Sequence, residues 1–149
     1  MKQLSKIQCA IFFLGGLLMV IGAGSFAFYT PTLRLQVGDV SQVVRVTSWL
    51  FLLGTILFSV IQAMQVYEGE SLTIHRLKRI QNLANILFVL SGISMVDTVY
   101  TFALRWFDNP QLYYTYFLGK WIILMLIGAV LELYTTHRIS HELKKEECK

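Results

Sequence analysis

The sequence predicts an all-helical membrane protein in which one domain, residues 1–149, crosses a lipid bilayer with four helices. Hydrophobic residues make up 55% of the 149-residue chain, and the mean hydropathy is +0.57. These residues are gathered into long runs and do not recur on one face, which is typical of a membrane protein. A helical crossing needs about 20 largely apolar residues. Because four such runs use most of the chain, they leave no room for a soluble catalytic or ligand-binding domain.

The four crossings are expected to follow one another with short connections, at residues 7–29, 46–67, 83–107 and 113–134. A basic cytoplasmic loop, 68–82, joins the second crossing to the third, and a charged cytoplasmic tail, 135–149, follows the fourth. We expect both segments to extend the adjacent helices beyond the membrane.

Between the third and fourth crossings, Asn109 and Pro110 predict a turn. Aromatic rings flank this turn, and such rings favour the depth of the lipid headgroups. They are Trp106, Tyr113, Tyr114 and Tyr116.

The distribution of basic residues predicts that both termini lie in the cytoplasm. Nine Lys and Arg residues fall in the inner segments, and three, Arg34, Arg45 and Arg105, fall in the outer ones. The start of the chain also has features of a secretory signal, since Lys2 and Lys6 precede an apolar run that ends in GAGS. This run continues to Tyr29 and is longer than a typical signal core, which favours a membrane helix.

Each predicted crossing contains a pair of small residues among bulky aliphatic ones, and the pairs recur at nearly the same spacing in both halves of the chain. This suggests a tandemly duplicated helical hairpin, although small residues are also common in membrane helices generally. Helices in lipid associate through close backbone approach. We therefore expect these glycines to support helix packing and a homo-oligomer: Gly15, Gly16, Gly22, Gly54, Gly92 and Gly128.

The segment TSWLFLLGTILFSV in the second crossing, together with FFLGGLLMVIG in the first, resembles the small YrhK-like bacterial membrane proteins. Thr55 stands where that pattern usually has serine. The resemblance covers the first two crossings well and the last two loosely. It implies the cytoplasmic (inner) membrane of a bacterium and no established activity.

Two charged residues, Asp97 and Lys120, are predicted at similar depth in the outer half of the bilayer. A lone charge in hydrocarbon costs at least ~2.5 kcal/mol on insertion scales, so we expect an ion pair between them, supported by Ser94 and Thr101. In one alternative, Lys120 reaches the surface and hydroxyl groups solvate Asp97. In another, Asp97 belongs to a proton or ion site.

Glu132 is predicted near the inner end of the fourth crossing. Four amide side chains fall at a similar depth and form a polar cluster with it: Gln62, Gln65, Asn82 and Asn85. Glu132 either accepts hydrogen bonds from these amides or reaches Arg79, or it is a titrating group, because partial burial raises the pKa of a carboxylate.

Basic residues at the cytoplasmic end are expected either to be solvated or to dock anionic lipid or a cytosolic protein. They are His75, Arg76, Lys78, Arg79, Arg138, Lys144 and Lys145. No aromatic residues are interleaved with them, so nucleic-acid binding is not expected. The lipid bilayer, further copies of the chain and a cytosolic protein are the expected partners.

No catalytic motif is found in the sequence, and we expect no cofactor. His137 and His141 lie one helical turn apart but lack a defined third ligand, so no metal site is predicted. Both thiols, Cys9 and Cys148, are expected to be reduced. The sequence thus favours a non-enzymatic, oligomeric membrane subunit, scaffold or sensor for a cytosolic partner. Small membrane subunits of this kind occur in bacterial stress, envelope and phage-defence systems. The alternative is a small transporter or ion-conducting oligomer that uses Asp97 or Glu132.

Overall fold

A computed structural model describes residues 5–33, 40–65 and 71–147, and every regular element within these ranges is helical. Four of the helices are long and apolar enough to cross a membrane. The predicted all-helical class with four candidate spans is therefore confirmed. The elements in chain order are α1 (Lys6–Leu33), α2 (Val40–Ala63), α3 (Leu72–Tyr100), the short 3-10 helix η1 (Phe102–Trp106), α4 (Pro110–Tyr116) and α5 (Trp121–Glu147).

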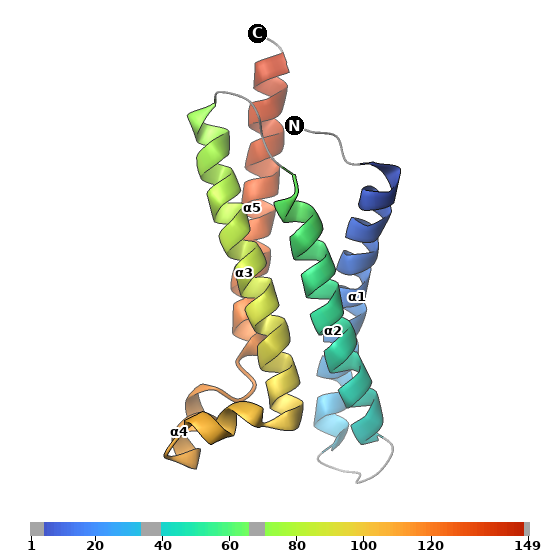
Figure 1. The fold of residues 1–149 in the computed structure, drawn as a ribbon, viewed down its shortest axis with the longest axis vertical. Helices are drawn as coiled ribbons and strands as arrows, with labels where there is room; N and C mark the ends of the chain where they lie inside the picture. Colours follow the sequence, from blue (N-terminus) through green and yellow to red (C-terminus); the bar gives the residue numbers. More distant parts are fainter. Residues whose placement is uncertain (1–4, 34–39, 66–70, 148–149) are drawn as a thin grey trace.

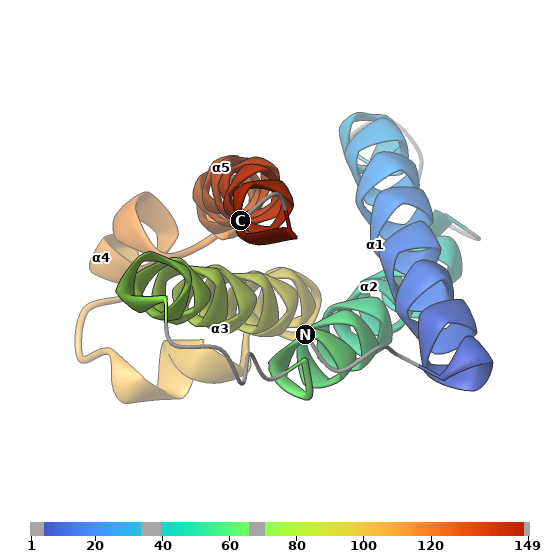
Figure 2. The same ribbon diagram turned by 90° about the horizontal axis from the view of Figure 1, so that it is seen from above.

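The four long helices run beside one another along the length of the molecule (Figure 1). Helix α1 begins and α5 ends at the same end, which we call the terminal end, whereas α4 lies at the opposite end, which we call the α4 end. Viewed along the long axis, α2 and α3 are neighbours, α1 packs on α2, and α5 packs on α3 (Figure 2). Helices α1 and α5 thus lie on the same side of the α2–α3 pair.

The backbones of α1 and α2 approach each other closely at several glycines, among them Gly15 and Gly54. A Cβ atom added at Gly15 would lie 2.8 Å from the backbone nitrogen of Phe58, and one added at Gly54 would lie 2.9 Å from the carbonyl oxygen of Gly15. Any larger residue would force the two helices apart. The packing role predicted for these glycines is confirmed, and the contacts lie within one chain.

The other predicted glycines pack less uniformly. Gly22 lies against Phe51, Gly92 against Thr55 and Leu52, and Gly128 against Phe88, whereas Gly16 has only looser contacts. Their close neighbours all belong to the same chain, so these contacts do not test self-association.

An aromatic core joins the long helices toward the α4 end. Phe26 of α1, Phe51 of α2 and Met95 of α3 are buried around Trp121, the first residue of α5. The Trp121 ring meets Phe26 edge to face, with 5.3 Å between the ring centroids. This core holds α1 close to α5 at that level.

Helix boundaries differ from the predicted crossings at several places, two of which lie on either side of α4. Helix α3 ends at Tyr100, because Thr101 takes a left-handed backbone conformation with φ 51°. Helix α5 begins only after Gly119, which has φ 75°. The predicted crossing 113–134 lies within the candidate span Pro110–Lys145, but it is divided between two helices, and Tyr113 belongs to the separate helix α4.

The predicted helical extensions of the third and fourth crossings are present. Helix α3 includes residues 72–82, and α5 continues through residues 135–147. Residues 68–70 and Cys148 lie outside the described ranges, and Cys9 is an exposed free thiol.

Candidate functional site

Asp97 is buried at the α4 end, with 1% of its surface exposed. Its Oδ1 accepts a hydrogen bond from the backbone N–H of Ala103 at 2.8 Å, and its Oδ2 accepts one from the hydroxyl of Tyr113 at 2.7 Å. Both carboxylate oxygens therefore have protein donors.

Local sequence produces this arrangement. The left-handed Thr101 turns the chain from α3 into η1, whose first amides have no partner inside that short helix, so the Asp97 carboxylate satisfies one of them. Asn109 then caps α4 by accepting from Gln111 N–H, with Pro110 at the first helical position. Helix α4 in turn brings the Tyr113 hydroxyl within hydrogen-bond distance of Asp97. Asp97 thereby stabilises the chain reversal between α3 and α5.

The predicted ion pair between Asp97 and Lys120 is wrong. Lys120 is exposed at the turn before α5, and within the described ranges the ion pair found is Arg138–Glu142 at 3.8 Å. The Ser94 and Thr101 hydroxyls make no hydrogen bond to the Asp97 carboxylate: Thr101 donates to the carbonyl of Tyr100, and Ser94 is buried. Sequence reasoning missed Tyr113, which was expected among the interfacial aromatic residues but is fully buried.

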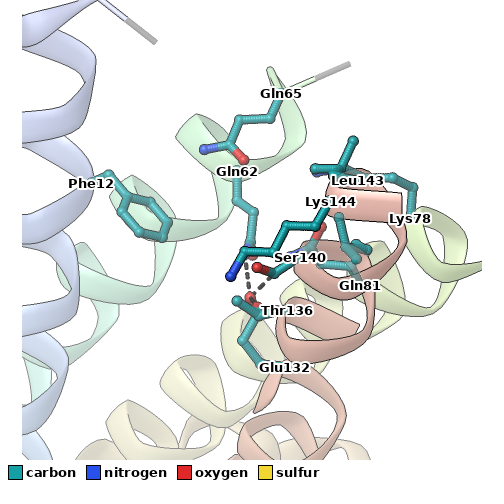
Figure 3. Close-up of a pocket in the computed structure, with 11 residues that line it drawn as sticks. Phe12, Gln62, Gln65, Lys78, Gln81, Glu132, Thr136, Ser140, Leu143 and Lys144 are labelled. Atoms are coloured by element: carbon teal, nitrogen blue, oxygen red, sulfur yellow. Dashed lines mark hydrogen bonds between the residues drawn. The ribbon is translucent and has the colours of Figure 1, made fainter. Parts of the chain in front are cut away.

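Glu132 of α5 forms a second polar cluster, nearer the terminal end. Its Oε1 accepts hydrogen bonds from Nε2 of Gln62 on α2, from Nε2 of Gln81 on α3 at 3.0 Å, and from the Thr136 hydroxyl at 2.9 Å (Figure 3). Glu132 thus connects three of the four long helices through one carboxylate oxygen.

A cavity of about 460 Å³ opens beside Glu132 (Figure 3). All four long helices line it: α1 with Phe12, α2 with Gln62 and Gln65, α3 with Lys78 and Gln81, and α5 with residues between Glu132 and Lys144.

Several polar atoms in the cavity wall have no hydrogen-bond partner within the described part of the chain. They are the acceptors Gln62 Oε1, Gln81 Oε1 and Glu132 Oε2, and the donor Lys78 Nζ. Gln62 and Gln81 are only 4% and 5% exposed. A buried polar group without a partner costs about 1–3 kcal/mol. The wall of the cavity therefore contains four polar atoms that are buried and that the described chain leaves unpaired.

The predicted amide cluster is half correct. Gln62 and Gln65 line the Glu132 cavity, but Asn82 and Asn85 do not. They line a separate cavity of about 380 Å³ beside α2. There the Ser59 hydroxyl donates to the backbone carbonyl of Asn85, and the buried Asn85 amide has no partner among the described residues.

Three members of the cluster were not predicted: Gln81, Thr136 and Lys78. The sequence nevertheless contains a pattern that places Gln81 on the buried side of α3. Buried residues on α3 recur at alternating intervals of three and four, the spacing of a helix seam that faces other helices. They are Ile74, Leu77, Gln81, Ala84, Phe88, Ser91 and Met95. Gln81 occupies a position of this seam, whereas Asn82 lies just outside it and is exposed.

The predicted basic residues surround the terminal end. His75, Arg76 and Arg79 are exposed on α3, and Lys144 and Lys145 are exposed in the last turn of α5. Arg138 pairs with Glu142 on the same helix. Two of the basic residues, the partly buried Lys78 and the exposed Lys144, also line the Glu132 cavity.

The described ranges contain no group of three or more His, Cys, Asp or Glu side chains that could hold a metal ion. No family model, curated protein or solved structure matches this chain. The resemblance of the first two crossings to YrhK-like proteins stays a prediction.

Proposed function

We propose that this chain is a non-enzymatic, multi-pass membrane protein that binds a small ligand in the Glu132 cavity and acts as the membrane-embedded sensor subunit of a larger assembly. One observation supports this proposal above all: residues of α2, α3 and α5 that line one cavity contain four buried polar atoms without a partner among the described residues. Buried polar groups are usually paired, so we infer that a bound molecule supplies the missing partners once these side chains turn toward the cavity.

The position of the cavity suggests how binding is reported. Helices α3 and α5 line it and also carry the basic residues of the terminal end. A ligand that favours one spacing of these helices shifts the population toward that spacing. We propose that the terminal end lies in the cytoplasm of a bacterial inner membrane and that its basic surface docks a cytosolic protein. Self-association into a homo-oligomer is part of the same proposal, since repeated copies strengthen docking.

The test is native mass spectrometry of the full-length protein extracted in mild detergent. Wild type is expected to retain a bound small molecule, and Glu132→Gln is expected to lose it. Glu142→Gln is the matched control, because it makes the same chemical change on the same helix outside the cavity. Absence of any Glu132-dependent bound mass would contradict the sensor proposal.

A small transporter remains the alternative, and the open carboxylate oxygen of Glu132 is the observation that favours it. Hydroxyls farther along α2 offer little support for a polar path, since Thr55 donates to the carbonyl of Leu52 and Ser48 to that of Arg45 within their own helix. Purified protein in liposomes would distinguish the two functions. A sodium or proton flux that Glu132→Gln abolishes would favour transport.

A further inference from the structure

Three exposed side chains join α2 to α3 at the α4 end. Arg45 and Trp49 are four residues apart and therefore lie on one face of α2, and Tyr100 is the last residue of α3. The indole N–H of Trp49 donates a hydrogen bond to the Tyr100 hydroxyl at 3.2 Å. The Arg45 guanidinium lies over the Tyr100 ring, 5.8 Å from its centroid. We call these three residues the arginine–aromatic cluster.

The contacts within the cluster do not use all of its hydrogen-bond donors. A guanidinium that stacks on a ring does so through its flat face, so the N–H groups along its edge stay available. Arg45 makes no ion pair among the described residues. The Tyr100 hydroxyl accepts from Trp49, which leaves its own proton for another acceptor. The cluster therefore combines a cation and a hydroxyl donor on an exposed surface.

The cluster lies where two candidate membrane spans end, beside the start of α2 and the end of α3 in Figure 1. The α2 span, Gln42–Ala63, is about 33 Å long at 1.5 Å per residue, close to the thickness of the hydrocarbon core. Arg45 lies in its first turn, and Tyr100 is the last residue of the α3 span. In the bilayer proposed around these helices, the cluster is thus at headgroup depth.

A lipid phosphate matches the donors at this depth. Its oxygens accept two parallel N–H bonds from one guanidinium, and the Tyr100 hydroxyl supplies a further donor. Arginine suits this role because its fork fits phosphate while its face stacks on an aromatic ring. The indole of Trp49 favours the same membrane depth.

We propose that the arginine–aromatic cluster binds the phosphate of one phospholipid from the leaflet at the α4 end. Arg45 binds the phosphate oxygens, Tyr100 donates its hydroxyl proton to the same group, and Trp49 positions that hydroxyl. This inference rests on the membrane-spanning part of the proposed function and is independent of the Glu132 cavity.

The test measures lipid retention by the full-length protein in mild detergent, using native mass spectrometry. The probes are dioleoyl phosphatidylcholine and glucosyl dioleoylglycerol, which have the same acyl chains, no net charge, and differ in the phosphate. Wild type is expected to retain phosphatidylcholine about tenfold more tightly, since the glucosyl lipid lacks the charge-assisted hydrogen bonds.

Two pairs of variants assign this preference to the cluster. Arg45→Gln is expected to remove most of it, whereas Arg105→Gln, the same change at an exposed arginine of the same end, preserves it. Tyr100→Phe keeps the ring under Arg45 and is expected to weaken phosphatidylcholine retention about threefold. Tyr116→Phe, at an exposed tyrosine of α4, leaves retention unchanged. Circular dichroism checks that each variant remains helical.

The wild-type comparison decides the inference without any variant. Equal retention of the two lipids overturns it, and so does an equal loss in Arg45→Gln and Arg105→Gln. Displacement of the lipid by excess inorganic phosphate also overturns it, because the site would then take free phosphate. These results leave a Glu132-dependent bound mass, and with it the sensor proposal, standing. Absence of that mass with an Arg45-dependent lipid retained overturns the sensor proposal alone.

Discussion

Asp97 and Glu132 are two carboxylates set between the long helices, and their surroundings differ. At the α4 end, both oxygens of Asp97 accept hydrogen bonds from groups on η1 and α4. Toward the terminal end, Glu132 uses one oxygen to accept three hydrogen bonds, and its other oxygen is buried without a partner in the described chain.

This difference in hydrogen bonding distinguishes a carboxylate that stabilises the fold from one that is a candidate for ligand binding. A carboxylate whose hydrogen-bonding capacity is used by the fold contributes stability, and its loss leaves buried donors unpaired. A carboxylate that has one unpaired oxygen, next to other unpaired polar groups, contributes less to the stability of the fold and is a better candidate for ligand recognition. Four substitutions test this division.

Asp97→Ala is expected to have the largest effect on stability. It removes the acceptor of two buried hydrogen bonds and leaves the Tyr113 hydroxyl and the Ala103 amide unpaired, which should cost about 3 kcal/mol of unfolding free energy. Reversible unfolding in detergent measures the loss. Asp108→Ala, at an exposed acid of the same end, is the control and should change little. Equal stability of the two variants would show that Asp97 does not fasten the chain reversal.

Tyr113→Phe is expected to cost less, about 1–2 kcal/mol, because it removes one hydrogen bond to Asp97 and keeps the buried ring. Combined with Asp97→Ala, its effect should be smaller than in wild type, since the bond is already absent. A double-mutant cycle measures this coupling. Strict additivity would mean that the two side chains act independently.

Glu132→Gln is expected to change the unfolding free energy by less than about 1 kcal/mol. The glutamine keeps an oxygen that can accept from Gln62 and Gln81, and it removes a charge from a half-buried position. Thermal unfolding measures stability, and the retained ligand mass reports binding on the same sample. A loss of stability as large as that of Asp97→Ala would remove the contrast between the two sites.

Lys120→Met is expected to have the smallest effect, with an unfolding midpoint within about 2 °C of wild type, because Lys120 is exposed and makes no ion pair among the described residues. Thermal unfolding again provides the measurement. If Lys120→Met instead rescued an Asp97→Asn variant, the two residues would be paired after all.

The sequence also predicted correctly that Glu132 lies among amide side chains. That prediction depended only on the depth at which each residue was expected to lie in the bilayer. Residues at matching distances along neighbouring helices were grouped, which identified Gln62 and Gln65 but also included Asn82 and Asn85. Depth does not specify which way a side chain faces. The rotation of each helix about its own axis decides which side chains face the neighbouring helices. On α3, the buried seam includes Gln81 and excludes Asn82.

By itself, the sequence determined the fold class and the four long helices, because runs of apolar residues long enough to span a bilayer favour helices that satisfy their own backbone hydrogen bonds. It also determined where α1 and α2 could approach closely, through Gly15 and Gly54.

Only the tertiary structure decided the partners of the two acids. The breaks at Thr101 and Gly119 separate α4 from its neighbours and bring Tyr113 to Asp97. The packing of α5 on α3 brings Glu132 to Gln81 and within hydrogen-bond reach of Gln62 on α2. Hydrogen bonds act over about 3 Å, so such pairings depend on helix rotation and chain reversals that hydropathy does not encode.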